Sequence, residues 1–392
     1  MAATTTIEAM KDTSAIEPML LKPARPLRLL FLFPGMVMGG AERHGLDLMR
    51  RLRTVGYDTS LVIYGRNATD RMETILRAEG AVLLEVKGMS SPGGWMRVLR
   101  ELRRQKADVI FCVNHSVAVV ATVLKSLGLL GGKTICIFHT TVLQPNDARN
   151  FPLFRWAAGR LDALVYVGES QKRYWETDGL MAAHALRIAN GVDLQAFGEA
   201  SEGAPLSRRA LGLTAKDYVI GIVAGLRPEK NHEELIEALA ILRGRDIPAK
   251  LLIIGEGARR GAIEARVRDL GLEREVIFVG EQPDVRPYVR LCDVCVLCSR
   301  TESFSLAALE VLALGAPVVS SDVGGMAEIV KDGLNGLLYP SGDASALAER
   351  LERLSRPEIR EPMRAAARGS ILDFGVDRMV ARYIDLVREI TQ

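Results

Sequence analysis

The stretch Arg300-Thr301-Glu302-Ser303-Phe304-Ser305-Leu306-Ala307-Ala308-Leu309-Glu310 follows Val294–Cys298, an apolar run with the composition of a buried strand. Seven residues separate its two carboxylates, so Glu302 lies on the loop after the strand and Glu310 about one turn into the next helix. Backbone N–H groups at such a helix start form an anion site. Carboxylates repel phosphate but accept hydrogen bonds from hydroxyl groups. The stretch therefore predicts a sugar nucleotide, with phosphates at the helix start, one glutamate on the sugar and the other on the ribose.

Glu310 can also be interpreted as a structural acid, because it lies in the apolar sequence Leu309-Glu310-Val311-Leu312. A carboxylate in such surroundings needs a partner, since an unpaired buried charge is costly. We favour the ligand-binding interpretation over the structural one.

Short apolar runs alternate with helical patterns on both sides of this stretch, which predicts parallel sheets covered by helices on both faces. The series that contains the stretch has predicted strands at Tyr218–Val223, Lys250–Ile254, Val276–Phe278, Val294–Cys298, Val318–Ser320 and Gly336–Tyr339. An earlier series has them at Leu29–Phe33, Ser60–Tyr64, Val82–Val86, Val109–Val113, Thr134–Phe138, Ala163–Val167 and Arg187–Ala189. The final segment, Val376–Thr391, is predicted to be a helix.

The two series predict an α/β protein with two doubly wound, Rossmann-like domains. A polar segment with Gly and Pro near 198–207 separates them, and few contacts are expected across such a linker. We predict a disordered tail at 1–26, a first domain at 27–197, a second domain at 208–374 and a last helix at 375–392.

The composition excludes several classes of protein. Of the 392 residues, 48% are hydrophobic and 25% charged, which is the balance of a globular protein. The net charge of +3 is too small for a protein that covers nucleic-acid phosphates, so no nucleic-acid partner is expected. Residues 1–200 hold 25 Lys and Arg against 19 Asp and Glu, an excess that fits either an anionic membrane surface or ordinary sampling variation.

No apolar run is long enough to span a bilayer, since the most apolar stretch, Ser116–Leu130, is broken by Lys125. The first 26 residues include three acidic side chains and lack the continuous apolar region of a secretory signal. We therefore expect a cytoplasmic protein, for which peripheral contact with the inner face of the plasma membrane is a hypothesis.

Cys292, Cys295 and Cys298 form a C-x-x-C-x-x-C sequence of the kind that can hold zinc or an iron–sulfur cluster. The run has strand composition, so Cys295 is expected to point away from the other two, which would lie about 20 Å apart. Three thiolates placed in this way cannot share one metal. We predict small side chains packed in a buried strand, and no metal site.

Two glycine-rich loops follow predicted strands. Pro34–Gly40 ends in Gly39 and Gly40 at the start of a helix, where backbone N–H groups suit a phosphate or a polar substrate. A later loop contains Gly255 and Gly257, which would let a nucleoside approach the backbone. Each signal is weak by itself, because neither loop has a complete nucleotide-binding motif.

Three polar side chains also follow strand ends. Arg227 and Lys230 lie on the loop before a helix, where they would either hold a diphosphate or be solvated loop cations. His139 follows the strand Thr134–Phe138 of the first series. A lone histidine is more often structural than catalytic, but its position at a strand end favours a catalytic role.

Together these segments resemble the retaining glycosyltransferases of family four, which have the GT-B fold. The resemblance covers residues from about 28 to 391. It rests on the two spaced glutamates and on Gly39-Gly40-Ala41-Glu42, Leu226-Arg227-Pro228-Glu229-Lys230, Gly255-Glu256-Gly257 and Val323-Gly324-Gly325-Met326-Ala327-Glu328. It implies two Rossmann-like domains that face each other across a cleft, with the last helix returning to the first domain.

The resemblance further implies that the second domain holds a nucleotide-sugar donor and the first domain the acceptor. The implied contacts are Glu302 with sugar hydroxyls, Glu310 with the ribose, Ser303, Phe304, Ser305 and Leu306 with the diphosphate and sugar, Arg227 and Lys230 with the diphosphate, and His139 beside the reacting sugar.

Two features depart from the family pattern. Gly225 stands where the family often has arginine, so either Arg227 reaches the same phosphate from a shifted position or one cation is missing. Ser303 and Ser305 stand where glycines are frequent, which could alter the room for the donor sugar.

The mechanism implied by the resemblance is transfer with retention at the anomeric carbon. The acceptor hydroxyl attacks from the leaving-group face, and the departing phosphate accepts its proton. Cations and helix-start amides stabilise the leaving group. No Asp-x-Asp sequence occurs, so neither a diphosphate-bound metal nor a cofactor is expected, and the nucleotide sugar is a substrate.

The acceptor is the least defined part of the prediction. The helix Trp95–Lys106 has one apolar face and five cations on the rest of its surface. This pattern fits an interfacial helix at an anionic bilayer, and it fits a surface helix that covers a sheet, which we favour.

We therefore predict a metal-independent retaining glycosyltransferase for polysaccharide synthesis. It would move a sugar from a UDP- or GDP-sugar to a hydroxyl of a glycan or lipid-linked acceptor. The alternatives are a sugar-nucleotide epimerase or phosphorylase on the same fold, or a catalytically silent subunit that binds nucleotide sugars.

Overall fold

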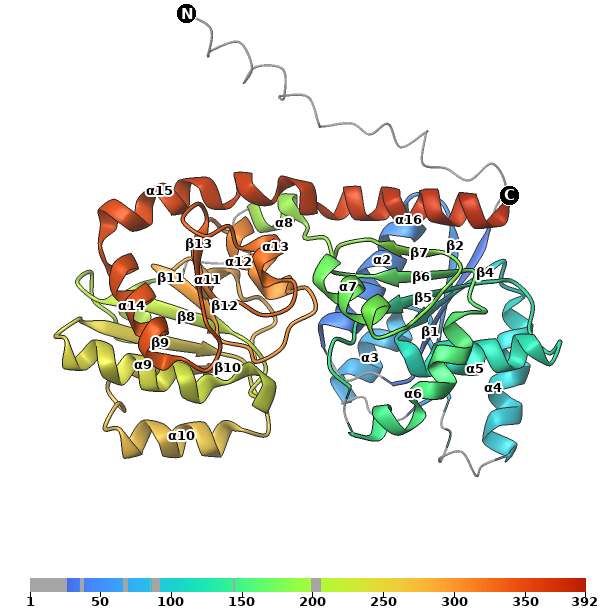
Figure 1. Cartoon of the computed structure of the whole chain (residues 1–392). Coiled ribbons are helices and arrows are strands. Elements are labelled where there is room, and N and C mark those ends of the chain that lie inside the picture. Colours follow the sequence, from blue (N-terminus) through green and yellow to red (C-terminus); the bar gives the residue numbers. More distant parts are fainter. Residues whose placement is uncertain are drawn as a thin grey trace, which may run out of the picture.

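The computed structural model describes residues 27–35, 39–65, 70–84, 86, 92–143, 145–198 and 206–392. The predicted tail at 1–26 and most of the predicted linker lie outside these residues. Two α/β domains lie side by side, and helices α15 (Pro357–Ala367) and α16 (Val376–Thr391) run along one side of the pair (Figure 1).

The first domain is built on a sheet of seven parallel strands in the order β3-β2-β1-β4-β5-β6-β7. The strands are β1 (Arg28–Phe33), β2 (Asp58–Ile63), β3 (Val82–Leu83), β4 (Val109–Val113), β5 (Lys133–Phe138), β6 (Ala163–Tyr166) and β7 (Ala185–Arg187). The helices are α2 (Gly40–Thr54), α3 (Asp70–Ala78), α4 (Pro92–Gln105), α5 (His115–Ser126), α6 (Pro145–Ala158) and α7 (Glu169–Thr177). Because helices cover both faces, the central strands β1 and β4 consist almost entirely of buried apolar residues.

The second domain has six parallel strands in the order β10-β9-β8-β11-β12-β13. The strands are β8 (Tyr218–Val223), β9 (Ala249–Ile254), β10 (Val276–Gly280), β11 (Val294–Leu297), β12 (Val318–Ser321) and β13 (Gly336–Tyr339). The helices are α9 (His232–Gly244), α10 (Arg260–Asp269), α11 (Arg286–Val289), α12 (Leu306–Ala313), α13 (Met326–Ile329) and α14 (Ala344–Ser355), with short 3-10 turns η2 (Arg208–Leu211), η3 (Pro228–Lys230) and η4 (Gly369–Phe374).

The predicted architecture is confirmed, since each predicted strand has its counterpart in one of the two sheets. The prediction did not include α7, the short helix Leu194–Gly198, or the helices α14 and α15 that follow the second sheet. The signal for α14 was present, because Leu347, Leu351 and Leu354 recur at helical spacing and are buried against the second domain.

The chain crosses between the domains in two neighbouring segments. The N–H of Val192 donates to the carbonyl of Phe374 at 2.9 Å, and the N–H of Val376 donates back to Val192 at 2.9 Å. Helix α8 (Leu194–Gly198) already packs on the second domain, where Arg286 donates to the carbonyl of Ala196 at 2.7 Å. The predicted boundary at 198 stays a prediction, and these contacts place the nearest crossing between the domains at Val192, just before the polar linker.

Helix α16 returns to the first domain, as predicted, and packs against α2. Its buried face includes Tyr383, whose ring lies 6.1 Å from that of Phe111 in the central strand β4. The last residues of the chain are thus part of the core of the first domain.

The three cysteines of the C-x-x-C-x-x-C sequence are divided between two packing regions. Cys292 and Cys295 lie in the same hydrophobic cluster, and Cys298 lies in the cluster on the other face of the second sheet. A side chain at Gly221 would contact both Sγ atoms of Cys292 and Cys295. The prediction that Cys295 points away from Cys292 is therefore wrong, because Cys292 precedes β11 and does not follow the alternation of the strand.

The apolar face of α4 is part of the core of the first domain, where Val98 and Leu102 are fully buried. The arginines of the helix lie on its exposed side. This arrangement is the sheet-covering helix that the sequence favoured. Among the helices of the described residues, none is both long and apolar enough to cross a bilayer.

Candidate functional site

In each sheet the strand order reverses beside the first strand, between β1 and β4 in the first domain and between β8 and β11 in the second. Ligands of doubly wound folds bind outside the carboxyl ends of the strands at such switch points. The loops at these two places meet at the interface between the domains. A Cβ atom at Gly40, after β1, would lie 3.9 Å from Leu306 at the start of α12.

The start of α12 provides free backbone donors. Ser305 caps the helix, and its hydroxyl accepts the N–H of Ala308 at 3.3 Å. Within the part of the chain that the structure describes, the N–H groups of Phe304 and Ser305 donate to no protein group. These two amides and the helix dipole can bind an anion.

Glu302 lies beside Lys230, and their charged atoms are 2.6 Å apart. Both side chains are only 16% exposed, so the pair is shielded from bulk water. The carboxylate and the ammonium come from the loops after β11 and β8, which are neighbouring strands in the sheet. The sequence placed each residue on a loop after a strand, but it did not show that the two strands are neighbours. The loop of Glu302 rests directly on Gly324 and Gly325, where a Cβ atom would collide with the carbonyl oxygens of Glu302 and Ser303.

Glu310 is 5% exposed and forms an ion pair with Arg43 of α2. Burial raises the pKa of the Glu310 carboxyl, and the charge and hydrogen bond of Arg43 oppose that rise. The partner that a buried acid requires is therefore present, and it comes from the other domain. A ribose that binds Glu310 would have to share the carboxylate with Arg43 or displace it.

Arg227 folds back over Gly225. Its Nε atom would lie 3.6 Å from a Cβ atom at that position, and it pairs with Glu229 at 3.0 Å. Across the domain interface, burial raises the pKa of Glu42 while the charge of Arg227 opposes the rise. Arg227 thus occupies the space beside position 225 where the family often has its arginine.

Gly255 and Gly257 lie where the neighbouring backbone leaves no room for a side chain. A Cβ atom at Gly255 would collide with the carbonyl of Ala224, and one at Gly257 would lie 2.5 Å from that of Leu226. Gly255 also has a φ of +145°. Close packing of the two loops therefore explains these glycines, and approach of a nucleoside to them stays a prediction.

His139 follows β5 and joins the two domains. Its backbone carbonyl accepts the hydroxyl of Ser303, which also contacts the hydroxyl of Thr141. Its ring nitrogen Nε2 lies 3.2 Å from Nδ1 of His44. Burial lowers the pKa of His139 well below its usual value, and the neighbouring His44 lowers it further. The serine in place of a glycine at 303 thus provides a hydrogen bond between the domains.

Glu328 forms a second connection between the domains. Its carboxylate accepts the N–H groups of Glu169 and Ser170 at 2.8 and 3.1 Å, at the start of α7 in the first domain. Its other oxygen accepts from Arg187 at 2.9 Å. Because the N-cap residue Gly168 has no side chain, Glu328 caps α7 from the opposite domain.

Replacing Glu328 with Ala is expected to loosen the closed arrangement of the domains. The change leaves two N–H groups and Arg187 without their acceptor, which should lower the free energy of unfolding by about 1–3 kcal/mol. Small-angle X-ray scattering should show a larger radius of gyration. The matched control is Glu358→Ala, at an exposed position of α15, and equal scattering curves for the two variants would contradict the connection.

Two buried histidines predict a loss of stability in acid. Burial lowers the pKa of both His44 and His232 from 6.5 to about 4. Below pH 6.5 these histidines bind protons in the unfolded chain but stay neutral in the folded chain. The free energy of unfolding should therefore fall from pH 6.5 toward 4 by roughly 3 kcal/mol for each residue. Urea unfolding between pH 5 and 7.5 measures this slope, and His232→Asn should reduce it. An unchanged slope in that variant would contradict the assignment.

Sequence reasoning missed four residues of the site: Arg43, His44, Thr141 and Glu328. Arg43 and His44 lie three and four residues after Gly40, so their place in the first turns of a helix was visible. Their partners were not visible, because those partners come from segments far away in the sequence or from the other domain.

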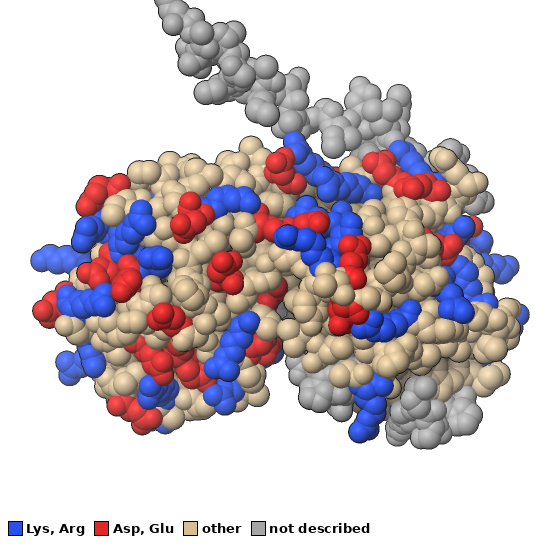
Figure 2. Space-filling model, in the orientation of Figure 1, with Lys and Arg blue, Asp and Glu red and all other residues tan. Residues whose placement is uncertain are grey.

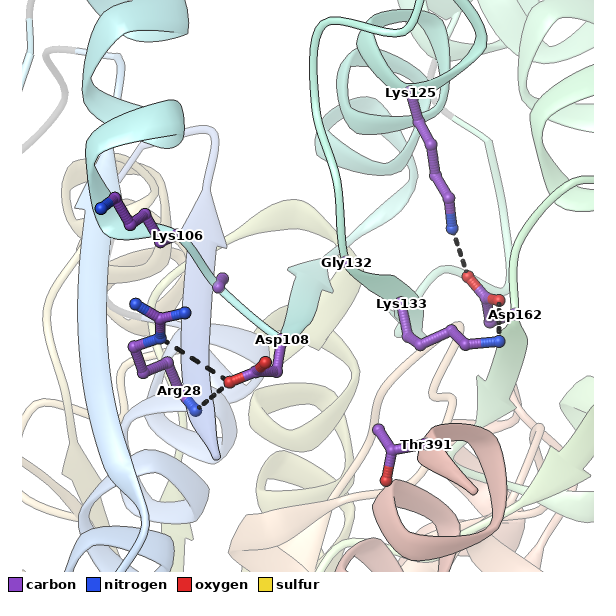
Figure 3. A pocket seen from close by; sticks show the side chains of 9 residues that line it. Arg28, Lys106, Asp108, Lys125, Gly132, Lys133, Asp162 and Thr391 are labelled. Carbon is purple, nitrogen blue, oxygen red and sulfur yellow. Dashed lines mark hydrogen bonds and ion pairs between the residues drawn. The ribbon is translucent and has the colours of Figure 1, made fainter. Parts of the chain in front are cut away.

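A hollow of about 670 Å³ lies at the opposite, amino-terminal ends of the first sheet's strands (Figure 3). Asp162 pairs there with Lys125 and Lys133, at 2.6 and 3.3 Å, and Asp108 pairs with Arg28 at 3.7 Å. Since most of its cations already have carboxylate partners, we assign this hollow no part in the site.

On the face shown in Figure 2, cations and carboxylates are intermixed over both domains, so this face has no extended basic surface for nucleic acid.

Both domains match known protein families. Residues 38–196 match the family Glycosyltransferase Family 4, and residues 204–370 match Glycosyl transferases group 1. The D-inositol 3-phosphate glycosyltransferase of Jonesia denitrificans is 34% identical over 226 residues, which is 54% of this chain and 53% of that protein. The chain thus spans about half the length of this relative. Phosphatidyl-myo-inositol mannosyltransferase of Mycobacterium leprae is 26% identical over 340 residues, 84% of this chain and 87% of that protein.

A similar solved structure is that of Anabaena Alr3699/HepE in complex with UDP-glucose, with a TM-score of 0.81 and 21% identity over 93% of this chain and 100% of that one. At this identity the likeness supports the fold. The two family matches cover the Gly39-Gly40 turn, the loop of Lys230 and both glutamates in their predicted order. With each domain matched and the switch-point loops facing each other, the chain belongs to glycosyltransferase family 4 and has the GT-B fold.

Proposed function

We propose that the protein transfers a sugar from a nucleotide sugar, a UDP- or GDP-sugar, to a hydroxyl of a glycan or lipid-linked acceptor, with retention at the anomeric carbon. The observation that carries the proposal is the pair of glutamates on either side of two free amide groups, at the interface with the first domain. The relatives named for glycosyl transfer to inositol-containing molecules, and the neighbour solved with UDP-glucose, support this class of reaction.

The donor would extend along the start of α12. Its diphosphate would accept hydrogen bonds from the N–H groups of Phe304 and Ser305, and its sugar hydroxyls would donate to Glu302. Its ribose hydroxyls would donate to Glu310. Arg43 already donates to one oxygen of this carboxylate, so a ribose would share Glu310 with Arg43 or displace it.

Stabilisation of the leaving group would come from the protein. As the bond to the sugar breaks, negative charge grows on the departing phosphate, and Lys230, Arg227 and the two amides are placed to stabilise it. These groups supply positive charge without a metal ion, which supports a metal-independent reaction. The acceptor hydroxyl would pass its proton to the departing phosphate.

A thermal-shift screen over UDP- and GDP-sugars tests the donor, because a ligand that binds only the folded state raises its stability. Product analysis by NMR then tests the configuration at the anomeric carbon. Retention supports the proposal, whereas inversion, or no stabilisation by any nucleotide sugar, would refute it.

Nucleotide release separates the proposal from its alternatives. A transferase releases nucleotide when an acceptor is present, and Glu302→Ala should suppress that release. An epimerase would convert the donor without an acceptor, a phosphorylase would require phosphate, and a silent binding subunit would release nothing. Each of these three outcomes would overturn the assigned reaction while leaving the family unchanged.

We also propose peripheral contact with anionic membranes through α4. The contact would be electrostatic, because the apolar face of the helix is buried while Arg100 and Arg103 are exposed and Met96 is 58% exposed. The double variant Arg100→Glu/Arg103→Glu should reduce co-sedimentation with vesicles that contain phosphatidylglycerol. The control Arg353→Glu/Arg356→Glu makes the same charge change on the second domain. Equal binding by both variants, or binding that does not depend on anionic lipid, would refute this contact.

A further inference from the structure

Two histidines, the buried His44 and the half-buried His139, lie together in the first domain beside the site. His44, on the buried face of α2, is 2% exposed. Its ring crosses that of His139 at an interplanar angle of 73°, with ring centroids 5.0 Å apart, and its Nδ1 lies 3.2 Å from Nε2 of His139. On the other side, the ring of Tyr383 from α16 lies 6.0 Å away and helps to enclose His44.

Both members of the pair are neutral near pH 7. Burial lowers the pKa of His44 to about 4, and burial together with His44 lowers the pKa of His139 well below its usual value. Two neutral imidazoles share one hydrogen bond in only two ways, because one nitrogen must donate and the other must accept. The structure therefore allows two arrangements of protons.

The second ring nitrogen of His44 decides between them. Within the described residues, Nε2 of His44 is buried and has no hydrogen-bond partner. If His139 donated to His44, the proton of His44 would lie on Nε2 as a buried N–H without an acceptor. If His44 donates from Nδ1, the atom left without a partner is a lone pair. Orphaned buried N–H groups are rarer than acceptors that lack a partner, so the second arrangement is favoured.

We propose that His44 is a positioning residue, which donates from Nδ1 to Nε2 of His139 and thereby fixes the proton of His139 on Nδ1. Nδ1 of His139 makes no hydrogen bond within the described residues, so it is the nitrogen available to a ligand. His139 then presents an N–H donor to an oxygen of the substrate and has no free lone pair with which to remove a proton. This role in the reaction rests on the proposed function, whereas the proton arrangement does not.

The proton arrangement can be measured on the protein without substrate. The chain has five histidines, so ¹⁵N-labelled side chains can be assigned by replacing one histidine at a time. Protonated and bare ring nitrogens differ in ¹⁵N chemical shift. We expect protonated Nδ1 in both His44 and His139. A proton on Nε2 of His139 in the folded protein would overturn the proposal, whether or not the protein transfers sugar.

Variants at His44 then test its influence on His139. His44→Asn keeps an amide donor near the position of Nδ1, whereas His44→Phe keeps the ring volume and removes the donor. In His44→Phe we expect the His139 signals to show a mixture of tautomers and kcat to fall about tenfold, with a smaller change in the donor KM. His44→Asn should restore the tautomer and most of kcat.

His184→Asn, at a half-buried position outside the site where the ring lies 3.8 Å from Glu389, is the matched control and should leave the His139 signals and kcat unchanged. Thermal unfolding of each variant separates a loss of folding from a loss of positioning. If His44→Phe and His44→Asn were folded and gave the same His139 spectrum, His44 would be a packing residue only. If the NMR result holds but no nucleotide sugar is bound, the proposed function fails and the proton arrangement stands.

Discussion

Replacing Lys230 with Met is expected to lower kcat for sugar transfer by about two to three orders of magnitude, the usual cost of losing one group that stabilises charge in the transition state. The ammonium lies 2.6 Å from Glu302 in a shielded position, next to the amides that would hold the diphosphate. Without it the leaving group would lose one of the two cations proposed to stabilise it, and Glu302 would lose its ion-pair partner. Steady-state kinetics with a saturating donor measures the effect.

The matched control for this prediction is Lys250→Met in the same domain. Lys250 donates to the carbonyl of Arg274 at 2.7 Å and lies on β9, and the loss of its charge should leave kcat unchanged. If Lys230→Met kept half or more of the wild-type kcat while folding normally, leaving-group stabilisation by Lys230 would be refuted.

Replacing Glu310 with Gln should raise the donor KM by about tenfold to a hundredfold, because a charge-assisted hydrogen bond contributes about 1.5–3 kcal/mol. The side chain keeps its size, so the packing around this 5% exposed residue should be preserved. Calorimetric titration with the free nucleotide measures the same loss without turnover.

The ion pair with Arg43 provides the control for Glu310. Arg43→Met removes the ion pair but leaves the carboxylate free for a ribose. If Glu310 binds the ribose, Glu310→Gln should weaken nucleotide binding far more than Arg43→Met does. Equal effects in the two variants, and no further loss in the double variant, would show that Glu310 serves only as the partner of Arg43.

The parts of the site that depend on local order along the chain could be predicted from the sequence. Glu302 and Lys230 each follow a parallel strand, and the carboxyl ends of such strands lie at one edge of a sheet, so their placement at that edge could be inferred. The amides at the start of α12 followed in the same way from a strand, a loop and a helix.

Contacts between the domains could not be predicted in this way. Arg43 with Glu310, Ser303 with His139 and Glu328 with the start of α7 join residues that are more than 150 positions apart. Their meeting depends on how the two domains are oriented, and no periodicity or local spacing encodes that orientation. The serine at 303 illustrates this limit, since its hydroxyl matters only because the carbonyl of His139 lies opposite.

The error on the cysteines has a similar origin. Face alternation holds only inside a strand, and Cys292 lies just before β11, in the turn after α11. The predicted start of the strand at Val294 agrees with the structure, so the error lay in extending the alternation two residues back to Cys292, outside the strand.

The return of α16 to the first domain has a consequence for how the chain folds during its synthesis. The strands of the first domain leave the ribosome early, yet Tyr383 and the rest of the buried face of α16 are translated only after the second domain. The first domain must therefore wait, with α2 and the ring of His44 uncovered, until the second domain and α16 have been translated. A stop codon a few residues upstream of Val376 would leave an unfinished first domain, and its exposed apolar surface would mark the product for chaperones or proteolysis.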